Sequence, residues 1–204
     1  AVTSTNHHFF SLSSDLYHNG PSWYISEVGN DSTGNGSNQF PFKTIQNAID
    51  ASNDNDTIII PLSTYNERVV IAKSITMLGE SQTFEKPTLE GQGENNIITI
   101  YGSPNVIIDN LTFQNGYGGA IGGGAIYTEQ ANLEIYNSLF QYNSVSDDGK
   151  GSAIYSTGTA TKISESIFKN NISLDGDGGA VFIANGEIDS SEFQNNTSGN
   201  KGGA

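Results

Sequence analysis

The chain has no cysteine and few basic residues. The absence of cysteine excludes a scaffold that is held together by disulfide bonds. Eight lysine and arginine residues stand against 22 aspartate and glutamate residues, which gives a formal net charge of −14 at pH 7. Such a surface repels nucleic acid and anionic lipid headgroups, so we expect no nucleic-acid binding. The single arginine, Arg68, leaves acidic polysaccharides hard to hold without a bridging cation.

Long hydrophobic runs are also missing. The best apolar runs, 58–60 and 69–72, are far shorter than the ~18 residues of a membrane span, so we expect no membrane insertion by this segment. Only 35% of the residues are hydrophobic, as in turn-rich or disordered chains, so periodicity has to decide between these classes. Ala1 is followed by small polar residues, as in a chain matured by signal-peptide cleavage, which favours a secreted or cell-surface location.

The N-terminal quarter predicts an arm followed by a cap. Residues 1–21 carry all three histidines and show no period, so we interpret them as an N-terminal arm. A strand is expected over 23–26. Apolar residues at helical spacing from Phe42 to about Ala51 predict a short amphipathic helix. We expect the region 22–56 to cap the core of a stacked-repeat protein.

From position 106 onward the sequence repeats itself. Four similar segments superimpose on phenylalanines that are spaced by 27, 28 and 25 residues. An isoleucine lies five positions before each phenylalanine, an asparagine three positions after the last three, and a Gly/Ala landmark about twelve positions beyond each. The structural repeat residues are Phe113, Phe140, Phe168 and Phe193; Ile108, Ile135, Ile163 and Ile188; Asn143, Asn171 and Asn196; and Gly123, Gly124, Ala125, Ala153, Gly178, Gly179 and Ala180.

A repeat of this length, built from short strands, predicts an all-β fold. We expect a right-handed single-stranded parallel β-helix, or solenoid, with a short N-terminal capping helix and coils over 57–204. Equivalent positions of successive turns lie ~4.8 Å apart, so the phenylalanines and isoleucines should form columns inside the core. The small residues suit a tight corner and the asparagines an amide ladder. Because residue 204 falls inside a landmark, we expect the solenoid to continue beyond it and its open end to permit end-to-end self-association.

The repeat motifs resemble those of known surface proteins. Gly-Gly-Ala followed by Ile or Val, and Phe-x-x-Asn, resemble the repeats of chlamydial polymorphic outer-membrane proteins and of adhesin-like β-helix proteins, over residues 106–204. The segments "WYISEVGNDSTGNGSNQFPFKTIQNAIDAS" and "DTIIIPLSTYNERVVIAKSITMLGE" resemble the amino-terminal cap and first coils of the pectin-lyase-like superfamily, which includes polysaccharide lyases and pectin methylesterases. These resemblances imply a right-handed β-helix that serves as an adhesin or passenger segment.

An enzyme is the alternative interpretation. A polysaccharide lyase needs a lysine or arginine base near a metal-neutralised carboxylate. Arg68 and Lys73 flank an early strand and are the only catalytic candidates, although the sequence favours solvated surface residues at both positions over a catalytic pair. The lyase resemblance extends to no catalytic motif. All histidines precede position 19, which argues against a polygalacturonase-like site, and the aspartate and glutamine signatures of pectin methylesterases are absent.

One pair of acidic loops suggests a metal site. Asp147 and Asp175 each follow a repeat phenylalanine by seven positions, so the repeat should stack their loops, with Asp148 and Asp177 close by. Stacked carboxylates repel one another unless they are solvated, protonated or bridged by a cation, and oxygen-only clusters suit Ca²⁺. Ca²⁺ is therefore the one cofactor that the sequence suggests, and an exposed acidic loop is the alternative.

Two further columns follow from the repeat. Tyr127 and Tyr155 each lie two residues after a landmark alanine, so they should stack and would offer aromatic surface to a carbohydrate. Glu134, Lys162 and Glu187 each lie six residues before a repeat phenylalanine, so they should form a ladder of alternating charge. Such cross-strand pairs contribute only ~0.2–1 kcal/mol each, which indicates a structural role.

These observations favour a non-catalytic module of a secreted or cell-surface protein, acting as an adhesin, a stalk or a self-assembling structural protein. Its expected partners are further copies of itself, or a polysaccharide or other host or cell-surface ligand. A carbohydrate-active enzyme of the polysaccharide-lyase kind, or a carbohydrate-binding module, is the alternative function.

Overall fold

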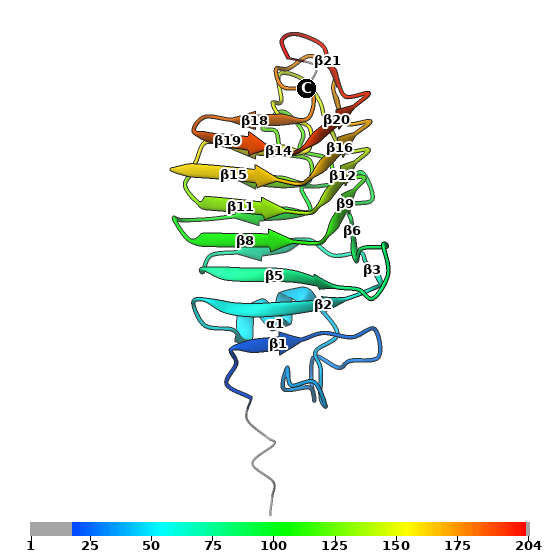
Figure 1. Cartoon of the computed structure of the whole chain (residues 1–204), viewed down its shortest axis with the longest axis vertical. Coiled ribbons are helices and arrows are strands. Elements are labelled where there is room, and N and C mark those ends of the chain that lie inside the picture. The colour runs from blue at the N-terminus through cyan, green and yellow to red at the C-terminus, as the bar shows by residue number, and fades with distance from the viewer. Residues whose placement is uncertain (1–17, 203–204) are drawn as a thin grey trace, which may run out of the picture.

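The computed structural model describes residues 18–202, and its regular secondary structure consists almost wholly of short strands (Figure 1). Most of the predicted N-terminal arm, and the final Gly-Ala of the last landmark, lie outside the described residues. The described strands form four parallel sheets. Sheet 1 contains β1 (Ser22–Tyr24), β2 (Asp56–Pro61), β5 (Ile75–Glu80), β8 (Asn105–Asp109), β11 (Asn132–Tyr136), β15 (Ala160–Ser164) and β19 (Gly186–Asp189).

The other three sheets complete each turn. Sheet 2 contains β3 (Thr64–Tyr65), β6 (Thr88–Glu90), β9 (Thr112–Gln114), β12 (Leu139–Gln141), β16 (Ile167–Lys169) and β20 (Glu192–Gln194). Sheet 3 contains β4 (Val69–Ile71), β7 (Ile98–Ile100), β10 (Ile126–Thr128), β14 (Ile154–Ser156) and β18 (Val181–Ile183). A short corner sheet contains β13 (Ser144–Val145), β17 (Ile172–Ser173) and β21 (Thr197–Ser198).

Successive strands belong to different sheets, so the chain winds into a solenoid. One turn passes from sheet 1 to sheet 2, in later turns through the corner sheet, and then to sheet 3 before it returns to sheet 1. Each strand pairs in parallel with the equivalent strand of the next turn. In Figure 1 the strands of sheet 1 run from left to right on the near side while the chain climbs, which is the right-handed sense. The predicted right-handed parallel β-helix is therefore confirmed.

The phenylalanine and isoleucine columns lie where the repeat predicted them. Phe113, Phe140, Phe168 and Phe193 pair in register, with successive ring centroids 4.9, 4.8 and 4.9 Å apart. Ile108, Ile135, Ile163 and Ile188 pair in register in sheet 1. Ile188 is 39% exposed, because β19 is the outermost described strand of that sheet. The rest of both columns, apart from the partly buried Phe193, is fully buried and forms the core.

The predicted capping helix is α1 (Ile45–Ala51), which begins later than the apolar pattern from Phe42 suggested. The carboxylate of Asp31 accepts hydrogen bonds from the two backbone N–H groups that precede Ile45, which fixes a non-helical entry. Thr44 then caps the helix by accepting from the backbone N–H three residues on. The buried face of α1 packs near β2 and β4 at the N-terminal end of the solenoid (Figure 1). Among the described residues no helix has the length and apolar character that a membrane crossing needs.

Two corners of each turn use left-handed backbone. The residue two positions after each repeat isoleucine, and the residue two positions after each repeat phenylalanine, have φ between 43° and 57°. These residues are Asn110, Asn137, Glu165 and Ser190, and Asn115, Tyr142, Asn170 and Asn195. Asparagine is enriched because it tolerates this region better than most residues. The landmark corner needs glycine, since φ of Gly123 is +62° and a Cβ there would lie 2.2 Å from the carbonyl oxygen of Ile126.

The predicted amide ladder is present inside the solenoid. Asn143 and Asn171 are fully buried. The Nδ2 of Asn171 donates to the carbonyl oxygen of Phe140 at 3.0 Å and to Oδ1 of Asn196 at 2.9 Å. Its Oδ1 accepts from the backbone N–H and from Nδ2 of Asn143, both at 3.0 Å. These side chains therefore satisfy backbone groups at a corner where the strand ladder is interrupted.

Candidate functional site

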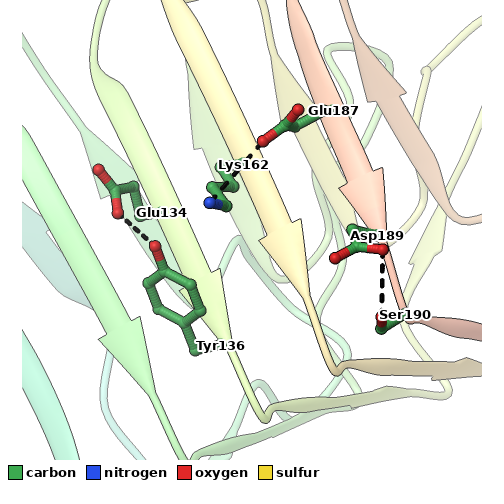
Figure 2. A network of polar contacts seen from close by, with 6 residues as sticks. All are labelled: Glu134, Tyr136, Lys162, Glu187, Asp189 and Ser190. Carbon is green, nitrogen blue, oxygen red and sulfur yellow. Dashed lines mark hydrogen bonds and ion pairs between the residues drawn. The ribbon is translucent and has the colours of Figure 1, made fainter.

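The outer surface of sheet 1 carries charged side chains on adjacent strands. Along β8, β11 and β15, alternate residues turn toward the core and toward solvent. The outward positions of β8, β11, β15 and β19 include Asp109, Glu134, Tyr136, Lys162, Glu187 and Asp189, which together form what we call the acidic face. Figure 2 shows all of these but Asp109, projecting from neighbouring strands of one surface.

The predicted charge ladder is present in register but is only partly an ion-pair ladder. Lys162 lies between Glu134 and Glu187 on adjacent strands. Its Nζ lies 3.8 Å from Oε1 of Glu187, and the two side chains are 46% and 69% exposed, so the pair contributes about 0–1 kcal/mol. Glu134 instead accepts a 2.5 Å hydrogen bond from the hydroxyl of Tyr136 (Figure 2). This hydrogen bond, followed by burial and the charge of Glu134, raises the pKa of Tyr136.

A hollow of about 510 Å³ lies along the acidic face. It is lined by Asn105, Asn132, Leu133, Glu134, Ala160, Thr161, Lys162, Gly186 and Glu187. Nδ2 of Asn132 donates to Oδ1 of Asn105 at 2.8 Å, and the register partner of Asn132 on the next strand is the small Ala160. The loss of side-chain volume at Ala160 opens the hollow. Amide, carboxylate and ammonium groups around it offer both donors and acceptors, as a ligand rich in hydroxyl groups requires.

The two basic residues predicted as lyase candidates have different surroundings. Nζ of Lys73 donates to the carbonyl oxygens of Ser52 at 2.6 Å and Asp50 at 3.2 Å, so it satisfies carbonyl groups at the C-terminal end of α1. Arg68 is exposed beside a separate hollow of about 110 Å³. Lys73 therefore has a structural role at the end of α1, whereas Arg68 lies beside a cavity.

Acidic side chains flank Arg68 in that smaller hollow, which Glu67, Glu90 and Glu94 also line. The carboxylate of Glu67 accepts from the backbone N–H groups of Ile45 at 2.8 Å and Gln46 at 3.1 Å, at the first turn of α1. Burial raises the pKa of Glu67, although these two hydrogen bonds oppose the rise. Both carboxylate oxygens of Glu67 therefore already accept hydrogen bonds from the first turn of the capping helix.

The aspartates predicted to bind Ca²⁺ do not form a cluster. Asp147, Asp148 and Asp175 are exposed, and Asp177 is half-buried with its Oδ1 accepting from the backbone N–H of Lys201 at 3.2 Å. Within residues 18–202, no three histidine, cysteine, aspartate or glutamate side chains come together in a way that could hold a metal ion. The exposed acidic loop, the alternative interpretation, describes this region better.

An aromatic ladder runs along the outer surface of sheet 3. The rings of Tyr127 and Tyr155 stack as predicted, with centroids 5.3 Å apart and planes within 10°, and Phe182 extends the stack at 5.4 Å. Phe182 was not predicted, although it also lies two residues after a landmark alanine. Because the rings cover one another's faces, the stack offers mainly edges and hydroxyl groups to a sugar. The hydroxyl of Tyr127 donates to Glu129 at 2.6 Å, and burial, followed by this bond, raises its pKa.

Part of the chain is similar to part of a known protein. No family model matches the chain. The probable autotransporter YfaL of Escherichia coli (strain K12) is 36% identical over 83 residues, a match that covers 36% of this chain and 6% of that protein. The match thus involves only a small part of a much longer relative. Together with the solenoid, this partial similarity fits a parallel β-helix surface protein.

Proposed function

We propose that this chain is a passenger-like β-helix segment of a secreted or surface-displayed protein, and that it acts without catalysis as an adhesin or stalk. The partial similarity to a probable autotransporter supports the location. The regular stack of strands supports the scaffold role, because a solenoid presents a long, uninterrupted outer surface to a partner.

The proposed ligand is a carbohydrate bound along the acidic face. The observation that carries this proposal is the hollow of about 510 Å³ between Asn132, Ala160 and Lys162. Sugar hydroxyls donate and accept hydrogen bonds, and the amides and charged groups of the hollow can do both. The carboxylates of Glu134 and Glu187 repel acidic polymers, so neutral sugars or amino sugars fit this surface better than uronic acids.

A glycan array followed by calorimetric titration of the best neutral or amino sugar tests this proposal. Replacing Ala160 with tryptophan fills the hollow and removes no hydrogen-bonding group, and it should weaken binding at least about tenfold, or about 1.4 kcal/mol. Glu134→Gln should also weaken it. Glu192→Gln makes the same charge change on the exposed part of β20 in sheet 2 and should leave affinity unchanged. Affinity that is insensitive to A160W, or the absence of binding to such sugars, contradicts the proposal.

A lyase-like activity is the second candidate function, because Arg68 stands beside a cavity that carboxylates line. Incubation with pectate and alginate, with and without Ca²⁺, would reveal it through unsaturated products. Turnover that disappears in the Arg68→Ala and Lys73→Ala variants would replace the non-catalytic proposal. If pectate and alginate stay uncleaved in every reaction, the result supports the scaffold role.

A further inference from the structure

The loop between β5 and β6 is fastened to two later turns by a single lysine. Nζ of Lys86 donates to Oδ1 of Asn110 at 2.9 Å and to Oδ1 of Asn137 at 3.0 Å. Asn110 and Asn137 occupy the same corner of successive turns, where φ is 57° and 43°. Because a C=O bond is about 1.2 Å long, the amine nitrogen lies within about 4 Å of the Asn110 carboxamide carbon. That separation is close to the contact from which an amine can attack a carbonyl group.

The carboxamide of Asn110 is held at all of its polar atoms. Its Oδ1 accepts a second hydrogen bond, from Nδ2 of Asn137 at 3.2 Å. Its Nδ2 donates to the carbonyl oxygen of Gly79 at 2.7 Å. Donors at the oxygen polarise the carbonyl group and would stabilise negative charge that develops there during an attack. The amide nitrogen, which would be the leaving group, is fixed on the opposite side.

Partial burial of Lys86 makes loss of its proton easier than in a fully exposed lysine. Burial lowers the pKa of Lys86, although the charge of Asp109 opposes the decrease. Burial likewise raises the pKa of Asp109, against the effect of Lys86. A partly buried lysine near a carboxyl group that can take up its proton is an arrangement in which an amine can act as a nucleophile.

We propose that Lys86 and Asn110 become joined by an isopeptide bond. The lone pair of the neutral amine attacks Cγ of Asn110, and a C–N bond forms while the bond from Cγ to Nδ2 breaks. One proton of the amine passes to the departing nitrogen, which leaves as ammonia. The products are a secondary amide between the two side chains and one ammonia molecule, and no oxidant or cofactor is needed.

Such a bond would connect consecutive turns of a chain that has no disulfide. It would close a covalent ring from residue 86 to residue 110, and a ring of this kind restricts the unfolded chain as a disulfide does. The proposal depends on the contacts and surroundings of Lys86 at this corner, so it does not rely on carbohydrate binding.

Intact-mass measurement of the purified, freshly denatured chain tests the proposal. We expect the whole population to be lighter than the sequence mass by one ammonia molecule, and fragment-ion spectra to show a branched peptide that joins Lys86 to Asn110. The Lys86→Arg variant keeps the positive charge but has no primary amine, and it should have the full sequence mass. Asn110→Gly keeps the left-handed corner without the carboxamide, and it should also have the full mass.

Four outcomes would overturn the proposal. The unmodified sequence mass in the native chain would show that no bond forms. Loss of ammonia that persists in K86R would instead indicate cyclisation at an Asn-Gly sequence such as Asn115-Gly116. A branched peptide at Asn137, or loss of ammonia that survives N110G, would show that Asn110 is not the acceptor.

Discussion

Replacing Asn171 with alanine tests whether the buried amide ladder stabilises the solenoid. The side chain is fully buried, and it bonds the backbone N–H of Asn143 and the carbonyl oxygen of Phe140, both at 3.0 Å. Alanine removes both bonds in an interior where water cannot replace them. Each buried polar group that loses its partner costs about 1–3 kcal/mol. We therefore expect the free energy of unfolding to fall by about 3 kcal/mol or more, which is over about 100-fold in the folding equilibrium.

Asn132→Ala is the matched control, because Asn132 also bonds an asparagine of the neighbouring turn but this hydrogen bond is exposed to water. Water replaces the lost hydrogen bond there, so the expected change stays within about 0.5 kcal/mol. Urea unfolding of both variants gives their free energies of unfolding. These compare directly if the slope of free energy against urea concentration is the same in both. An N171A variant that is no less stable than N132A would refute the reasoning.

Three further predictions concern the core, a corner and the cap. Phe140→Ala removes the middle of the buried stack and should lower the free energy of unfolding by about 3–5 kcal/mol. Tyr155→Ala in the outer ladder should lower it by only about 1–2 kcal/mol. Equal shifts of the urea midpoint in the two variants would contradict this prediction. Asn170→Ala should cost about 1–2 kcal/mol because φ is 55°, and Asn170→Gly should cost less in the same assay. Burial raises the pKa of Glu67 in the folded chain, so the stabilisation from its protonated form is complete below the pKa of the unfolded chain and is lost as pH rises through the pKa of the folded chain. Glu67→Gln should flatten that part of the curve of stability against pH. An unchanged curve would contradict the prediction.

The solenoid could be predicted because its repeat residues are nearly identical from turn to turn. Phe140 and Phe168 align in sequence and stack in space, since parallel pairing in register superimposes equivalent side chains. The asparagine ladder followed for the same reason. A ladder of buried serines, in which the hydroxyl of Ser166 accepts from the backbone N–H of Ser138, was missed because serine is common throughout the chain.

The alignment of the two acidic loops that were predicted to bind Ca²⁺ could not be deduced from the repeat, because the register changes within the loop. The segment from Phe140 to Gly149 is one residue longer than the segment from Phe168 to Gly176, yet Gly176 packs directly on Gly149. The extra residue lies between Val145, which still pairs with Ser173, and Gly149, so a fixed offset does not hold across the loop. Counting from one landmark cannot detect such a slip.

The hollow of the acidic face and the contacts of Lys86 could not be predicted from the repeat. The hollow depends on Ala160, which takes the place of Asn105 and Asn132 eight positions before a repeat phenylalanine. The repeat shows this replacement, but only the structure shows that it leaves a hollow on the outer surface. Lys86 belongs to a loop without a counterpart in the aligned repeats, and it meets Asn137 across 51 positions of sequence. The contacts of such non-repeating loops can be seen only in the folded structure.

Engineered cysteine pairs test the register of the solenoid most directly, because the natural chain has no cysteine to compete. Asn132, which is half-buried, and the exposed Ala160 are register partners on the outer side of β11 and β15, and paired strands lie about 4.8 Å apart, within the range that a disulfide spans. The account predicts rapid, complete disulfide formation in the N132C/A160C variant and almost none in N132C/S164C, which is displaced by four residues along β15. Absence of the first disulfide, or equal formation of both, would contradict the stacked register.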